Sequence, residues 1–325
     1  MRAAVLHAFG SADNLRYETV PDPEPGPGQV RIAVRAAGVH LVETMLRRGP
    51  EFNPMPETPE LPAILGGEVS GIVESVGPGV DPVWVGRAVV TPAGTSGGYA
   101  ELAVADLATV HPVPAGLSHE TAVAMVVTGT TALEFLDVAR LTPADVVLVT
   151  SAAGGVGQLV VQYAVGLGAR VVGVAGGPEK TATVRALGAD TAVDYRSDGW
   201  PEQVAAAIGG RSVTALLDGV GGEVARAALG LVAPGGRYVT IGDASGAGWL
   251  PDEETLAGQG ITWTDALDYL LTHRELSRGF EEKALAAAAA GRLVPDVRSF
   301  PLAEAARAHA ALESRATAGK VVLVP

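Results

Sequence analysis

The clearest chemical signal in this 325-residue chain is a cluster of glycines that follows a short apolar run. Residues 146–157 read Val-Val-Leu-Val-Thr-Ser-Ala-Ala-Gly-Gly-Val-Gly. A turn with so little side-chain volume lets the backbone approach a pyrophosphate, and the helix that follows directs its first amides at the negative charge. The pattern matches the dinucleotide fingerprint, with Ala152, Gly154 and Gly157 in its three glycine places.

Glycine-rich turns also serve purely structural purposes, so the surrounding sequence decides the interpretation. Here a strand, the loop, a helix and a second strand follow one another in the order that the fingerprint requires. We therefore expect a nicotinamide cofactor whose pyrophosphate is bound by the following residues: Ala152, Gly154, Gly155, Val156 and Gly157.

The end of the second strand indicates which nicotinamide cofactor binds. In an NAD site an acidic residue, about 20 positions after the glycines, holds the ribose hydroxyls. Here Ala175 and Gly176 stand in that place, which leaves room for a 2′-phosphate, and Lys180 follows as a counter-charge. Glu179 argues for NAD, but its place after Pro178 suits the first turn of a helix, where an acid complements the dipole. The sequence predicts NADP.

Composition excludes several kinds of chemistry and partner. The chain has no cysteine, which excludes disulfides, thiolate nucleophiles, iron–sulfur clusters and cysteine-ligated zinc. Its net charge of -13 disfavours nucleic acid as a partner. Residues 1–10 lack a secretory signal, and the apolar stretches at 156–165 and 284–290 are too short or too rich in small residues for a bilayer span of ~20 residues. We expect a cytoplasmic protein with no membrane partner.

The texture of the sequence predicts an α/β protein with two unlike domains. The first ~120 residues carry short β-branched runs between glycines and prolines, as antiparallel strands joined by turns do. Strands are expected here at residues 29–36, 68–76, 87–92 and 98–103, with a helix at 43–48 and an irregular loop at 51–62.

From about residue 118 the texture changes to apolar strands that alternate with longer helical stretches, which predicts a doubly wound parallel sheet. The expected strands are residues 146–150, 170–175, 191–194, 215–218 and 237–242. The expected helices are residues 121–139, 157–167, 179–187, 200–208 and 223–231. The remainder, with expected helices at 264–271, 275–290 and 303–313 and strands at 297–301 and 320–324, is too small for a domain of its own and is expected to complete the first one.

Several stretches besides the glycine loop resemble a known family. They are residues 1–5, 66–79, 97–101, 187–190 and 235–237. Together they resemble the medium-chain dehydrogenase/reductase superfamily, and within it the zinc-independent quinone oxidoreductases, the group that contains zeta-crystallin. The resemblance implies a GroES-like, mostly-β catalytic domain made of residues 1–122 and 263–325, split around a Rossmann NADP-binding domain at 123–262. It also implies a homodimer.

The resemblance implies particular residues for the 2′-phosphate of NADPH. In the family this group is held by a lysine past the second strand, a tyrosine after the third strand and an arginine near the C-terminus. The matching residues are Lys180, Tyr195 and Arg315, and Gly176 lies between the second strand and the lysine. All three family positions are therefore filled.

The same resemblance implies chemistry without a metal. Zinc-dependent members use a Gly-x-Cys motif, a Gly-His-Glu motif and a cysteine-rich lobe. Here His40 stands for the first cysteine, Gly67 for the histidine beside Glu68, and the lobe has no counterpart between Gly86 and Gly98. One imidazole and one carboxylate fall short of the three protein ligands of a catalytic zinc.

Without a metal, the expected reaction is hydride transfer from NADPH to an acceptor that is already electrophilic, a quinone or an α,β-unsaturated carbonyl. The resemblance places His40, Glu43, Thr128 and Thr131 at the acceptor, and we expect His40 and Thr128 to be catalytic. Related enzymes commonly have Asn in place of His40 and Tyr in place of Met45, and a histidine after a strand also serves as a structural hydrogen-bonding group. Two alternatives stay open: an enoyl-thioester reductase, and a cofactor-binding protein of the same fold without turnover.

Overall fold

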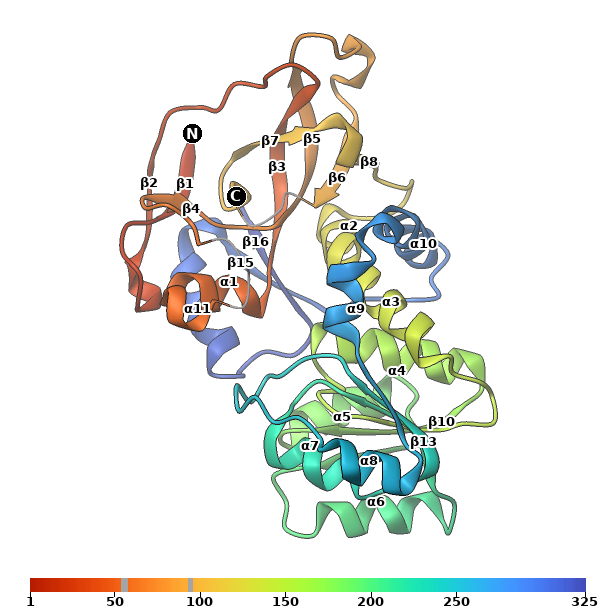
Figure 1. Cartoon of the computed structure of the whole chain (residues 1–325). Coiled ribbons are helices and arrows are strands. Elements are labelled where there is room, and N and C mark those ends of the chain that lie inside the picture. Colours follow the sequence, from red (N-terminus) through yellow and green to blue (C-terminus); the bar gives the residue numbers. More distant parts are fainter. Residues whose placement is uncertain (54–57, 93–95) are drawn as a thin grey trace. The chain divides into compact units, whose positions relative to one another are not determined.

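The computed structural model describes residues 1–53, 58–92 and 96–325 (Figure 1). Parts of the expected loop at 51–62 and of the stretch 86–98 lie outside these residues. Over the described residues, contacts divide the chain into unit 1, Met1–Thr128 with Glu281–Pro325, and unit 2, Gly129–Phe280. These boundaries differ from the expected ones at 122/123 and 262/263.

Unit 1 is built on a mostly antiparallel sheet in the order β15-β16-β3-β5-β6-β8, with β7 paired to β3. The strands are β3 (Gln29–Val39), β5 (Glu68–Val76), β6 (Ala88–Pro92), β7 (Leu102–Asp106), β8 (His111–Pro112), β15 (Val297–Pro301) and β16 (Lys320–Val324). A smaller sheet, β2-β1-β4, contains β1 (Arg2–Leu6), β2 (Leu15–Thr19) and β4 (Ala63–Ile64). Because β16 pairs antiparallel with β3, the C-terminal segment returns to the first domain's sheet. The predicted mostly-β, GroES-like fold class is confirmed.

One expected strand of unit 1 is divided in the structure. Residues 98–103 were expected as a single strand, but β7 begins at Leu102. Tyr99 instead donates its amide to the Leu65 carbonyl at 2.8 Å, and Ala100 forms a bridge with Ala3. The chain therefore joins the smaller sheet first and the larger sheet second.

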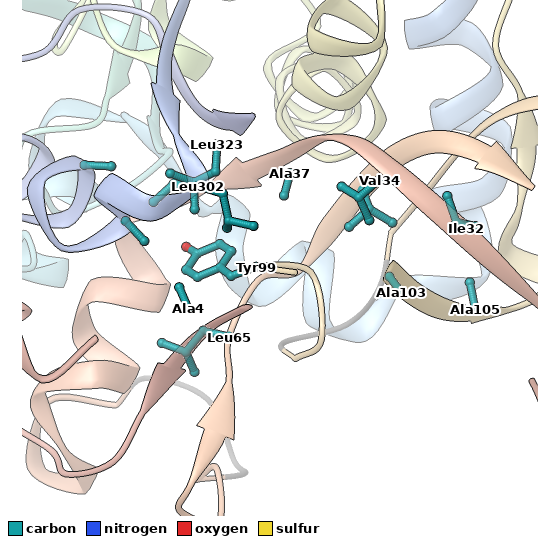
Figure 2. Packing of buried hydrophobic residues seen from close by; sticks show 14 of the residues in the cluster. Ala4, Ile32, Val34, Ala37, Leu65, Tyr99, Ala103, Ala105, Leu302 and Leu323 are labelled. Carbon is teal, nitrogen blue, oxygen red and sulfur yellow. The ribbon is translucent and has the colours of Figure 1, made fainter. Parts of the chain in front are cut away.

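The core of unit 1 lies between these sheets and the C-terminal helix. From Gln29 to Ala36 of β3, buried residues alternate with more exposed ones, as the period of a strand requires, and residues 36–39 are all buried. Figure 2 shows the Tyr99 ring among Ala4, Leu65 and Leu302, which come from three separate parts of the chain. Burial of each large side chain of this kind contributes about 1.5–3 kcal/mol.

A chain of buried polar groups crosses this core and ties α1 (Leu41–Arg48) to α11 (Ala305–Glu313). Arg47 donates from Nε to Nδ1 of His309 at 3.4 Å, and its guanidinium also contacts the Gly10 carbonyl and Glu313. With Nδ1 accepting, Nε2 of His309 carries the hydrogen and lies 3.1 Å from the Tyr99 hydroxyl. Burial lowers the pKa of His309 to about 4, and the Arg47 charge acts in the same direction.

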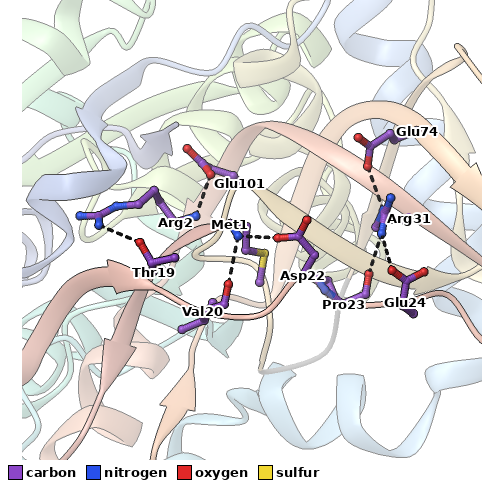
Figure 3. Close-up of polar contacts among 10 residues, drawn as sticks. All are labelled: Met1, Arg2, Thr19, Val20, Asp22, Pro23, Glu24, Arg31, Glu74 and Glu101. Atoms are coloured by element: carbon purple, nitrogen blue, oxygen red, sulfur yellow. Dashed lines mark hydrogen bonds and ion pairs between the residues drawn. The ribbon is translucent and has the colours of Figure 1, made fainter.

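On the surface of unit 1, Arg31 fastens the proline-rich connector at residues 21–28 to the sheet (Figure 3). Its guanidinium lies 2.8 Å from Glu74 on β5 and 3.1 Å from Glu24. It also donates to the Pro23 carbonyl at 3.2 Å. A segment that makes few backbone hydrogen bonds is thereby held along β3.

Unit 2, whose backbone is described throughout, contains a six-stranded parallel sheet in the order β11-β10-β9-β12-β13-β14. The strands are β9 (Val146–Val149), β10 (Arg170–Ala175), β11 (Thr191–Asp194), β12 (Val213–Asp218), β13 (Val232–Thr240) and β14 (Thr262–Asp265). The helices are α3 (Thr130–Ala139), α4 (Gly155–Leu167), α5 (Pro178–Ala186), α6 (Trp200–Ile208), α7 (Gly222–Leu229), α8 (Glu253–Gln259) and α9 (Ala266–Thr272). Helices cover both faces of the sheet, which confirms the predicted doubly wound Rossmann class (Figure 1).

The expected helix at 264–271 is partly wrong, because its first residues form strand β14. Thr262 lies beside Arg237 of β13 in parallel register, and the helix starts only after Asp265, whose carboxylate accepts the Leu267 amide at 3.0 Å. This pairing holds residues 262–265 in unit 2, and α9 packs against α3 and β13 of the same unit, which extends to Phe280. Helix α10 (Ser277–Ala289) then leads back to unit 1.

The expected helix at 121–139 is interrupted. Helix α2 (His119–Ala124) passes into a π-helical turn, Met125–Gly129, before α3 begins. The run His119–Ala139 is long and apolar enough to cross a membrane by length and composition, and 72% of its apolar window is buried. This run is longer than the apolar stretches at 156–165 and 284–290, and a mostly buried core helix passes the same test of length and composition.

The neutral, buried His309 predicts a pH dependence of stability. An unfolded histidine has a pKa of about 6.5, against about 4 in the fold. Below pH 6.5 the unfolded chain therefore binds a proton that the folded chain does not, and stability falls as the pH drops toward 4. The group accounts for a loss of roughly 3 kcal/mol across that window. Urea unfolding of the wild type and of His309→Gln between pH 4 and 7 measures it, and we expect a shallower slope for the variant. Equal slopes would contradict the assignment.

Candidate functional site

The glycine loop joins β9 to α4 and is shaped by a close approach of backbones. Ser151 has a φ of 53°, and its carbonyl accepts the Gly154 amide at 2.8 Å. A Cβ added to Gly157 would lie 2.2 Å from that same carbonyl oxygen, so only glycine permits the helix to start so near the strand. Ala152 has no positive φ and is fully buried, which explains why alanine suffices in the first glycine place.

The amides of this loop are arranged for an anion. Helix α4 has Gly154 as its N-cap, and the Gln158 amide donates to the Gly154 carbonyl at 3.0 Å. The amides of Gly155, Val156 and Gly157 precede that bond and are the N-terminal donors of the helix. The five residues expected at the pyrophosphate thus lie together at the carboxyl end of β9, where open parallel sheets bind dinucleotides.

A buried carboxylate secures the turn beside this loop. Asp218, at the end of β12, accepts the amides of Val220 and Gly221 at 3.1 Å each and contacts the hydroxyl of Thr150, the residue that precedes Ser151. The Tyr238 hydroxyl donates to it at 3.3 Å. Burial raises the pKa of Asp218, and these donors oppose the rise. Sequence reasoning did not single out Asp218, although an acid at the end of a buried strand before a glycine-rich turn was a usable signal.

The expected ribose end lies at the carboxyl ends of β10 and β11. A Cβ on Gly176 would lie 2.8 Å from the Tyr195 hydroxyl, so the two residues are in direct proximity. Lys180 is in the first turn of α5. The structure thus brings Gly176, Lys180 and Tyr195 to one edge of the sheet in unit 2. Arg315 belongs to unit 1, where it follows α11 with a φ of 54°.

His40 lies in unit 1 at the junction of β3 and α1, and Glu43 holds it in place. The Glu43 carboxylate accepts the His40 amide at 2.5 Å and the Gly67 amide at 3.1 Å, and it lies 3.1 Å from His40 Nδ1. Burial alone raises the pKa of Glu43, but His40 and Lys320 together lower it to about 2. The carboxylate is therefore ionised and accepts only, so Nδ1 of His40 carries a hydrogen.

A second buried carboxylate, Glu68, faces the other edge of the His40 ring. Glu68 Oε1 lies 3.3 Å from His40 Nε2 and 2.6 Å from the Lys320 ammonium. Both contacts are at ion-pair distance without hydrogen-bond alignment. A Cβ on Gly38 would lie 1.7 Å from Glu68 Oε1, so this carboxylate occupies the space that a side chain at position 38 would fill. Sequence reasoning missed Lys320, because nothing near it in the chain marks it as buried.

The remaining expected residues have different surroundings. Thr128 is buried in the π-helical turn, a feature that is frequent at functional sites. Thr131 lies on α3 in unit 2.

Two family descriptions match the chain. Residues 26–115 match the alcohol dehydrogenase GroES-like domain, and residues 187–323 match the zinc-binding dehydrogenases. A 2-haloacrylate reductase from a Burkholderia species is 34% identical over 332 residues, which cover 99% of this chain and 98% of that protein. A quinone oxidoreductase from Pseudomonas aeruginosa is 33% identical over 98% of both chains.

This chain belongs to the quinone oxidoreductase family of the medium-chain dehydrogenase/reductases. The structure of Escherichia coli quinone oxidoreductase complexed with NADPH is similar over the whole length of both chains, with a TM-score of 0.88 and 29% identity. The predicted family is confirmed.

The second family description names zinc. The residues around His40 in this chain do not fit a zinc ion. The Lys320 ammonium already lies against Glu68, and a cation at that carboxylate opposes a second one. Among the described residues, no group of three or more histidine and acidic side chains is placed to hold a metal ion.

The buried Lys320–Glu68 pair predicts an asymmetric response to substitution. Lys320→Met leaves a buried carboxylate without its cation, and removal of one partner of such a pair costs about 3–5 kcal/mol. Adding Glu68→Gln to Lys320→Met removes the orphaned charge, so the double variant should be more stable than Lys320→Met alone. Urea unfolding followed by circular dichroism measures both. If the two substitutions destabilise additively, Lys320 and Glu68 are not energetically coupled, and the assignment of a buried ion pair is contradicted.

Proposed function

We propose that this protein is a zinc-independent, NADPH-dependent oxidoreductase that reduces quinones or α,β-unsaturated carbonyls. The observation that carries the proposal is the cradle of bare backbone at the ends of β9 and β10, in a chain that aligns over nearly its full length with a quinone oxidoreductase. Unit 2 is proposed as the NADP-binding domain and unit 1 as the catalytic domain.

The cofactor is held by two groups of residues in this proposal. The amides at the start of α4, with the bare residues before them, bind the pyrophosphate through the helix dipole. These residues are Ala152, Gly154, Gly155, Val156 and Gly157. Lys180 and Tyr195 of unit 2 are proposed to hold the 2′-phosphate, and Gly176 keeps the end of β10 free of a side chain. The family resemblance adds Arg315, which belongs to unit 1. When bound, NADPH supplies the hydride.

His40 is proposed to donate to the acceptor. Hydride addition leaves negative charge on the acceptor oxygen, which then takes up a proton. Because Nδ1 carries the hydrogen that faces Glu43, Nε2 donates to the acceptor only when the ring is an imidazolium with a hydrogen on both nitrogens. Nε2 lies 3.3 Å from Glu68, without hydrogen-bond alignment. Thr128 is proposed as a second donor, through its hydroxyl. In the alternative reading, His40 only links Glu43 to Glu68 and takes no part in the reaction.

The acceptor is proposed to be conjugated. Without a metal Lewis acid, an ordinary carbonyl lacks the charge stabilisation that hydride addition needs, whereas conjugation spreads the charge in the acceptor itself. The name of the 2-haloacrylate reductase relative supports this class. Enoyl thioesters are the alternative acceptors, and cofactor binding without turnover is the alternative to catalysis.

The cellular setting is also a proposal. We propose a cytoplasmic homodimer that acts on small molecules, apart from membranes and nucleic acid. The net charge of -13 supports the exclusion of nucleic acid, because a phosphate backbone is repelled by such a chain.

Gly154→Val tests the proposed function. The wild type should oxidise NADPH when a quinone or an enone is added. A Cβ at residue 154 would lie 3.0 Å from Ser151 Oγ and 3.2 Å from its carbonyl oxygen, and the added methyl groups fill space that the pyrophosphate needs. We therefore expect Gly154→Val to lose both NADPH fluorescence enhancement and turnover.

A matched control lies on the same helix. A Cβ on Gly166 of α4 meets nothing within 4 Å, so Gly166→Val should keep both properties. Wild-type protein that binds NADPH but reduces only enoyl thioesters would support the alternative acceptors. Wild-type protein that binds NADPH without reducing any of the three classes would support the non-catalytic alternative. Retained NADPH binding in Gly154→Val contradicts the placement of the pyrophosphate.

A further inference from the structure

Arg196 lies at the ribose end of the proposed cofactor site. It is not among the residues expected to bind the 2′-phosphate. Strands β10 and β11 run parallel with Ala175 beside Asp194. The residues that leave the two strands are therefore neighbours as well, with Gly176 and Gly177 on one side and Tyr195 and Arg196 on the other. In a dinucleotide fold this edge receives the substituents of the adenosine ribose.

A single carboxylate locks the two turns together. Asp194 Oδ1 accepts the Gly177 amide and the Arg196 amide, both at 2.9 Å. The Tyr195 amide donates to the Ala175 carbonyl at 3.2 Å. Because Asp194 is engaged with two backbone donors, its negative charge is partly offset at the point where a phosphate would approach.

The Arg196 side chain folds back over the glycine pair. A Cβ on Gly176 would lie 2.9 Å from Arg196 Nε and 2.8 Å from the Tyr195 hydroxyl, and a Cβ on Gly177 would lie 3.5 Å from Arg196 Nη1. The Arg196 guanidinium and the Tyr195 hydroxyl thus both lie against the backbone of these two glycines. This convergence depends on the absence of side chains at positions 176 and 177.

The guanidinium is available to a ligand. Arg196 is exposed, and within the described residues its only hydrogen bond is the one from its backbone amide to Asp194. A guanidinium presents a planar fork of donors that matches a phosphate, and it keeps its charge at every working pH. Lys180, in the first turn of α5, adds a second cation to the same edge of unit 2.

We propose that Arg196 is a specificity-determining residue that binds the 2′-phosphate of NADPH and sets the preference for NADPH over NADH. The proposal rests on the proposed function and adds a ligand that belongs to the same unit as the glycine loop. In this proposal unit 2 supplies a guanidinium of its own for the phosphate.

Binding of NADPH and NADH to the full chain, measured by cofactor fluorescence, tests the proposal. Loss of a hydrogen-bonded charge pair predicts that Arg196→Ala weakens NADPH roughly ten- to hundredfold while NADH binds as before. Arg196→Lys keeps the charge but not the fork and should fall between the two. Arg211→Ala removes an exposed arginine elsewhere in unit 2 and should leave both affinities unchanged.

Competition by adenosine 2′,5′-bisphosphate and by ADP separates the phosphate from the rest of the cofactor. Arg196→Ala should weaken the bisphosphate alone. If Arg196→Ala keeps the wild-type preference for NADPH, or weakens NADPH and NADH equally, Arg196 does not read the phosphate, and the proposal is overturned while the proposed function stands. If the wild type binds neither nicotinamide cofactor, the proposed function itself fails.

Discussion

The approach of one backbone to another at the carboxyl end of β9 is the constraint on which the cofactor site depends. Gly157 must lack a side chain because the Ser151 carbonyl lies where its Cβ would be. That contact directs the first amides of α4 past the end of the strand. Asp218 accepts the Val220 amide and contacts the Thr150 hydroxyl, which links the neighbouring turn to the glycine loop. At the end of β10 the same principle recurs, since Gly176 is bare under Tyr195 and Arg196. The site consists largely of backbone, and its specificity comes from the few side chains at its edges.

The constraint in unit 1 is electrostatic, because two carboxylates, Glu43 and Glu68, are buried near one another. Glu43 is satisfied by backbone amides and by His40, whereas Glu68 depends on Lys320 from the last strand of the chain. A buried charge is tolerated only with a partner, so the return of the C-terminal segment is as much an electrostatic requirement as a packing one. The same arrangement occupies Glu68 with an ammonium, which disfavours a metal ion at that carboxylate.

Much of this organisation could be read from the sequence because local patterns determine it. β10, β11 and α6 begin and end where apolar periodicity predicts, and the glycine loop carries its own signature. Contacts between residues that are distant in the chain have no local sequence pattern that predicts them. The polar strand β14 is fixed by its pairing with β13, and Lys320 is buried because Glu68 lies 252 positions away in the chain but 2.6 Å away in space. Arg196 was passed over because its side-chain direction depends on two glycines of a neighbouring strand end.

The central claim is that hydride passes directly from NADPH to a conjugated acceptor without a metal. A single turnover with chelator-treated protein, an enone and NADPH deuterated at C4 tests it, with the two C4 epimers used separately and the product analysed by mass spectrometry. The account predicts that one epimer delivers its deuterium to the β-carbon of the product and that added zinc does not change the rate. A product that contains only solvent hydrogen at that carbon, or turnover that appears only with zinc, would contradict it.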